Sequence, residues 1–98
     1  MTMHTYMILF NYTDQGIRAV KEAAGRLDGL KRRLRELGGE VQAFYLTMGP
    51  YDTVAVVALP DDATMARLAL SLGAAGNVKT LTMRAFPEPE YREILATL

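Results

Sequence analysis

The 98-residue sequence predicts an α+β domain whose elements follow the order βαββαβ. Four short segments are rich in β-branched, aromatic and other apolar residues. Two longer segments between them carry apolar residues at helical spacing, and glycine or proline stands at most of the junctions. Because a chain of this length builds one core, we expect a single domain over residues 1–98.

The first strand is predicted at residues 4–11, where aromatic and apolar side chains dominate. A turn-like Asn-Tyr-Thr-Asp segment closes it. Thr13 or Asp14 can cap the helix that follows, because a short side-chain oxygen accepts hydrogen bonds from the free amides of a helix start.

The first helix is predicted from apolar residues that recur every three or four positions. These are Ile17, Val20, Ala24, Leu27, Leu30, Leu34 and Leu37. We expect Gly25 to mark a joint between a short leading turn and a longer helix of about residues 23–37. Gly38 and Gly39 end it, since glycine adopts a left-handed conformation at almost no cost. The basic cluster at 31–35 is expected to be a solvated helix face.

The second and third strands are predicted at residues 40–48 and 52–59. Gly49-Pro50-Tyr51 makes a tight connection between them, so we expect a hairpin. Pro60 stops the third strand, because proline donates no hydrogen bond to a sheet.

The second helix is expected to begin at a cap formed by Asp61 or Asp62. Its predicted inner face consists of Met65, Leu68, Ala69 and Leu72. It ends at the glycines and alanines of 73–76. Alternation over 77–86 predicts a fourth strand, and Pro87 leads into a short C-terminal helix.

Right-handed crossovers place the first and third strands side by side at the centre of a four-stranded antiparallel sheet. This is the ferredoxin-like arrangement. The composition of the strands supports it, because these two segments are continuously apolar, as strands buried on both faces are.

The second face of this sheet leads us to expect a homodimer. Half of the residues are apolar or aromatic, and two helices can cover only one face. The other face would present alternate residues of 6–10 and 54–58, a contiguous patch that rarely stays exposed. Two copies packed sheet to sheet around a twofold axis would bury it in a barrel-like core. Assembly above the dimer is left open.

Composition excludes several classes of function. Eleven basic and eleven acidic residues give zero net charge, which does not favour a nucleic-acid partner. No apolar stretch approaches the ~20 residues that span a membrane, and no basic leader is seen, so we expect a cytoplasmic protein. With no cysteine and a single His4, we expect no metal site and no cofactor.

Three residues are candidates for catalysis. In Gly49-Pro50-Tyr51-Asp52, a tyrosine beside a carboxylate at a strand mouth could orient a ligand or share a proton. The alternative is a turn in which Asp52 bonds the turn amides and Tyr51 packs on the rim. His4 is the third candidate, as a ligand or proton carrier, unless it is merely solvated at the strand start.

The candidates for ligand binding also include polar residues at the strand ends. Asn11 and Thr13 could bond a small polar ligand, or serve only the helix entry. A polar stripe on the fourth strand follows Asn77 and consists of Thr80, Thr82 and Arg84. If this stripe faces the dimer interior, it lines a pocket with an anion-binding arginine. If it lies at an edge, it is ordinary solvated surface.

The motifs resemble those of the GYD domain family. The defining motif stands here as Gly49-Pro50-Tyr51-Asp52, with Pro50 interposed in a plain Gly-Tyr-Asp pattern. The resemblance extends to residues 11–17 and 72–80. It implies the dimeric α+β barrel group, which includes cofactor-free monooxygenases, haem-handling enzymes, lactone isomerases and ligand-sensing domains. Such a fold does not choose among these functions.

The sequence therefore predicts a small cytoplasmic homodimer that binds a small organic ligand in or at the rim of the barrel. One alternative is a cofactor-independent monooxygenase or isomerase that uses Tyr51, Asp52 and His4. Another is a structural or oligomerisation module without a pocket.

Overall fold

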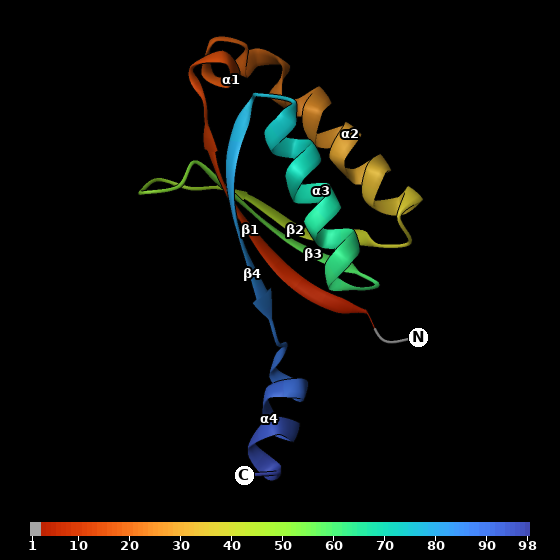
Figure 1. Cartoon of the computed structure of the whole chain (residues 1–98). Coiled ribbons are helices and arrows are strands. Elements are labelled where there is room, and N and C mark those ends of the chain that lie inside the picture. The colour runs from red at the N-terminus through yellow and green to blue at the C-terminus, as the bar shows by residue number, and fades with distance from the viewer. Residues whose placement is uncertain (1–2) are drawn as a thin grey trace.

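The computed structural model describes residues 3–98 and confirms the predicted α+β ferredoxin-like fold (Figure 1). Its elements are β1 (His4–Tyr12), α1 (Asp14–Arg18), the 3-10 turn η1 (Val20–Glu22), α2 (Ala23–Glu36), β2 (Glu40–Leu46), β3 (Thr53–Leu59), α3 (Asp62–Ala74), β4 (Val78–Ala85) and α4 (Glu88–Ala96). The four strands form one antiparallel sheet in the order β2-β3-β1-β4, so β1 and β3 are central as predicted.

The predicted joint at Gly25 is wrong, because the helical break lies earlier, at Ala19 and η1. Gly25 sits inside α2 with open space around its Cα. The Thr13 side chain accepts a hydrogen bond from the Gly16 amide and thereby starts α1 directly after β1. Arg26 of α2 then donates to the Ala19 carbonyl and ties the break to the longer helix.

The connection between β2 and β3 is longer than predicted and spans residues 47–52. Thr47 closes it with two hydrogen bonds, from its amide to the Asp52 carbonyl (2.9 Å) and from its hydroxyl to the Tyr51 carbonyl (2.6 Å). The hairpin therefore forms, but its strands stop short of the glycine and proline.

One face of the sheet is covered by α2 and α3 (Figure 1). The buried residues there are Tyr6, Ile8 and Phe10 of β1, Ala55, Val57 and Leu59 of β3, Leu30 and Leu34 of α2, and Met65 and Leu68 of α3. Full burial of a side chain of the size of leucine contributes about 1.5–3 kcal/mol, so this layer makes a large favourable contribution to folding.

The opposite face is apolar, as predicted. In the sheet register, Met7 lies between Val56 and Met83, and Leu9 lies between Val54 and Leu81. Residues of a strand alternate between faces, so this second set points away from α2 and α3. Leu81 and Met83 are each 42% exposed. We call these six residues the open face.

The C-terminal helix α4 projects beyond the end of β4, away from the two layers (Figure 1). The radius of gyration is 14.4 Å, against about 13 Å for a compact chain of this length. Tyr91, Ile94 and Leu95 of α4 are each roughly half exposed. No helix within residues 3–98 has the length and apolar character needed to cross a membrane.

Candidate functional site

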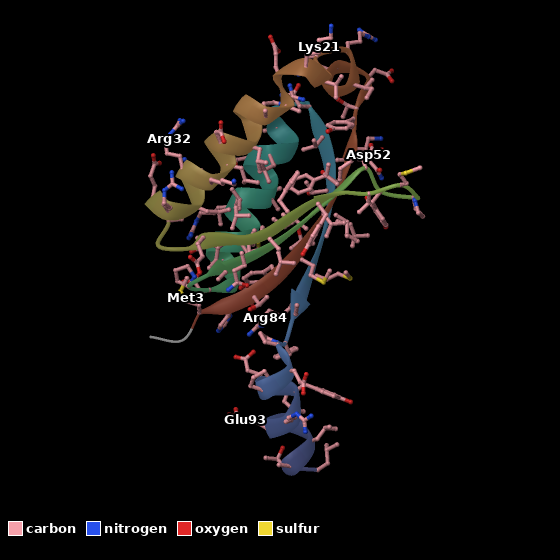
Figure 2. The ribbon with its side chains drawn as sticks, turned by 180° about the vertical axis from the view of Figure 1, so that it is seen from behind. Met3, Lys21, Arg32, Asp52, Arg84 and Glu93 are labelled. Carbon is pink, nitrogen blue, oxygen red and sulfur yellow. The ribbon has the colours of Figure 1, made fainter. Side chains whose placement is uncertain are left out.

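The predicted site residues lie at opposite ends of the sheet. His4 begins β1, whereas Asp52 pairs with the other end of that strand at Phe10 and Tyr12. At about 3.3 Å per residue, some 20 Å of strand separates the two ends. Figure 2 shows Asp52 beside the β2–β3 connection and Arg84 at the far end, next to α4. One chain therefore does not bring His4 together with Tyr51 and Asp52.

Asp52 ties β3 to the end of β1. Its carboxylate Oδ2 accepts a hydrogen bond from the Tyr12 amide at 2.8 Å, and its own amide donates to the Phe10 carbonyl at 2.8 Å. The expectation that Asp52 bonds the amides of its own turn is thus wrong, because the amide belongs to the neighbouring strand. Tyr51 is half-buried at the same end.

Thr13 and Asn77 connect the segment between β1 and α1 to the segment between α3 and β4 by hydrogen bonds. The Thr13 hydroxyl donates to the Gly76 carbonyl, and the Thr13 amide donates to the Asn77 carbonyl. Gln15 adds hydrogen bonds to the Asn77 side chain and the Ala75 carbonyl. A Cβ on Gly16 would lie 1.9 Å from the Asn77 carbonyl oxygen, so only glycine allows this close approach. The predicted cap at Thr13 is confirmed.

The polar stripe of β4 lies on the helix-covered side of the sheet. Thr80, Thr82 and Arg84 stand opposite the buried residues Phe10, Ile8 and Tyr6. Directly opposed residues share a face, so the stripe does not belong to the open face. Arg84 packs over the Phe86 ring, at 4.5 Å from its centroid, and donates to the Ala85 and Thr5 carbonyls.

His4, Tyr6 and Asp62 form a cluster that the sequence did not reveal. The Tyr6 hydroxyl donates to Asp62 Oδ1 at 2.5 Å, and His4 Nδ1 lies 3.5 Å from both oxygens. Asp61 accepts from the Thr64 amide and caps α3, which leaves Asp62 for Tyr6. Tyr6 and Asp62 are 56 positions apart, so no local pattern connects them. The one available signal was the second aspartate at 61–62, where a helix cap needs only one.

The cluster braces β1 against α3, and its bonded Tyr6 and Asp62 are poorly suited as base and acid, respectively. Burial, followed by the hydrogen bond to Asp62, raises the pKa of Tyr6 far above its usual value. The Tyr6 hydroxyl in turn lowers the pKa of Asp62. A phenol that stays protonated is no base at neutral pH, and a carboxylate that stays ionised is no acid.

Two hollows lie on the helix side and at the loop end. The first, of about 480 Å³, lies between α2, α3 and the sheet, and Asn77 is its one predicted ligand-binding residue. The second, at the loop end, is lined by Asn11, Tyr12, Thr13, Asp14, Gln15, Gly76 and Lys79. Among residues 3–98, no group of three histidine or acidic side chains is placed to hold a metal ion.

The fold and its Gly-Pro-Tyr-Asp turn define an α+β ferredoxin-like protein, and comparison with known families agrees. The model of the GYD domain matches residues 6–95. A Thermus thermophilus protein named "Glutamine synthetase and cystathionine beta-lyase binding protein" is 40% identical over 86 residues, which cover 87% of this chain and 90% of the relative. The chain belongs to the GYD domain family. No solved structure matches it.

We expect Asp52→Ala to lower the free energy of unfolding by about 1–3 kcal/mol, because the Tyr12 amide loses its acceptor. Asp52→Asn keeps an acceptor oxygen and should cost less. Urea unfolding of the three proteins measures both effects. If Asp52→Ala unfolds at the wild-type midpoint, the carboxylate does not hold β3 to β1.

We expect the stability that Tyr6 adds over Tyr6→Phe to decline above about pH 10, where the tyrosine of the unfolded chain ionises. The raised pKa in the folded state means that the unfolded chain then binds fewer protons, so stability falls as pH rises. Urea midpoints of both proteins between pH 7 and pH 11 measure this. A pH-independent difference would contradict the raised pKa.

Proposed function

We propose that this protein is a cytoplasmic homodimer that binds an enzyme of amino-acid metabolism, with glutamine synthetase and cystathionine beta-lyase as the first partners to test. The name of the relative and its 40% identity over most of both chains support the choice of partner. The observation that carries the proposal is the unpartnered apolar side of α4. A chain without cysteine is compatible with a reducing compartment.

The open face supports the dimer. Its six apolar residues come from the two central strands and the edge strand β4, so they form one continuous patch. A twofold axis brings the same patch of each copy together, and no second complementary surface is needed. The sheet-to-sheet layer would then bury the side chains of Met7 and Leu9 on both copies.

The proposed docking surface is the apolar stripe of α4. Tyr91, Ile94 and Leu95 of α4, with Leu98 just beyond its end, follow the spacing i, i+3, i+4, i+7, and all are exposed. Such a stripe is how an amphipathic helix enters a hydrophobic groove. We assign it to the enzyme and not to the second copy, because α4 extends beyond the end of β4 and so lies clear of the sheet layer (Figures 1 and 2).

We expect sedimentation to show a wild-type dimer that Leu81→Glu converts to a monomer, because the substitution places a charge in the apolar layer. Thr82→Glu is the matched control, since the neighbouring residue on the same exposed strand points to the other face. A monomeric wild type, or a dimeric Leu81→Glu protein, would contradict the proposed interface.

We expect purified glutamine synthetase or cystathionine beta-lyase of the same organism to bind the dimer in surface plasmon resonance. Ile94→Asp should weaken that binding by at least about tenfold, the usual loss at a central anchor. Glu93→Ala, on the opposite side of α4, is the control and should bind as the wild type does.

Failure of both enzymes to bind the wild type would overturn the proposed function. Equal affinity of the two α4 variants would remove α4 from the docking surface. A monomeric Ile94→Asp protein would assign the stripe to the dimer instead.

A small organic ligand at the rim is a second proposal. It is favoured by the hollow at the loop end, where the side chains of Asn11 and Lys79 form no hydrogen bond or ion pair with other residues in 3–98. Catalysis without a cofactor is less supported, since Tyr51 and Asp52 lie far from His4 within one chain. Asp52 does not line this hollow but bonds Tyr12, which does, so loss of a ligand from a stably folded Asp52→Asn protein would extend the site to that carboxylate.

A further inference from the structure

We propose that the cavity between α2, α3 and the sheet is a binding site for a small organic carboxylate with an apolar body. The site lies on the helix side of the sheet, away from the open face and from α4. It is therefore separate from both surfaces assigned above.

The floor and walls of the cavity are apolar. Buried side chains of the core, Phe10, Leu30 and Leu68, form the floor, and Phe44 adds a second aromatic wall. The volume of about 480 Å³ lies within the range of about 300–1,000 Å³ typical of small-molecule sites. An apolar body that enters this space leaves water for apolar surroundings.

The space exists because small residues stand where larger ones would fill it. Gly29 of α2 lines the cavity, and a Cβ built there meets no atom within 4 Å. Ala23 and Ala75 line other parts of the wall. A glycine inside a helix costs about 1 kcal/mol relative to alanine, and here it leaves room beside the core.

Two arginines of α2 give one side of the cavity a positive charge. Arg26 and Arg33 flank Gly29 and lie about two helical turns apart. Neither has a carboxylate within ion-pair distance among residues 3–98. Arg26 donates to the Gly16 and Ala19 carbonyls, which hold its guanidinium in place while donors remain for a ligand.

A hydroxyl reaches the cavity from the sheet. Thr53 is only 6% exposed and lies in the wall of the cavity, on the sheet side. An apolar interior with arginines at its side and a threonine in its wall matches a ligand with a hydrocarbon body and an anionic head.

The first experiment is calorimetric titration with decanoate. Gly29→Leu should fill the cavity and weaken binding by at least about tenfold. Gly25→Leu is the matched control: it replaces a glycine of the same helix, its Cβ also meets open space, and it does not line the cavity. Both substitutions remove a helical glycine, so thermal unfolding should show both variants at least as stable as the wild type.

The second experiment tests the charge. Arg33→Gln should weaken decanoate binding by about tenfold, the value of one charge-assisted hydrogen bond, and leave the neutral decan-1-ol unaffected. Arg33 is chosen before Arg26, because the latter also bonds the backbone near α1. Titration with 2-naphthoate in parallel distinguishes an aliphatic from an aromatic body.

Several results would overturn the proposal. If neither acid binds the wild type at millimolar concentration, the cavity is not a carboxylate site. Equal decanoate affinity of Gly29→Leu and Gly25→Leu places any binding elsewhere. If decan-1-ol binds as tightly as decanoate, the site does not recognise the carboxylate. None of these outcomes depends on the enzyme partner, so the docking proposal succeeds or fails separately.

Discussion

Burial of the two faces of β1 is the constraint on which the rest of the structure depends. The strand is central, so the side chains of Tyr6, Ile8 and Phe10 point to one face and those of Met7 and Leu9 to the other. The chain has helices for only the first set. A shift of one residue in the register of β1 would exchange the two sets of side chains between the faces. The register therefore also decides which apolar side chains α2 and α3 leave uncovered.

The segments that carry the family resemblance meet at one end of this strand, where they satisfy backbone groups. Asp52 supplies an acceptor for the Tyr12 amide beyond the last strand pair, and Thr13 and Asn77 connect the chain before α1 to the chain before β4. The motif thus has a sufficient structural explanation, since buried amides without partners are costly. The motif therefore does not by itself indicate a catalytic site.

The elements were predictable because each depends on local periodicity, and the central position of β1 and β3 followed from their continuous apolar runs. The face of the sheet on which Arg84 lies could not be predicted, because it depends on the pairing of β4 with β1. The bond between Tyr6 and Asp62 joins residues 56 positions apart, and no short pattern reports it. The cavity could not be predicted from the sequence either, because it depends on the absence of a side chain at Gly29.

The apolar residues of the chain lie in three separate places, and this separation would allow a ligand, a second copy and a partner protein to bind at different surfaces. One set fills the layer beneath α2 and α3, a second forms the open face, and a third lies on α4 beyond the end of β4. A second copy on the open face would leave both the helix layer and α4 accessible. Each copy of a dimer could then hold a ligand beneath its helices and present its own α4 to a partner. Because the cavity and α4 share no residue, ligand and partner would influence each other only through the sheet that joins them.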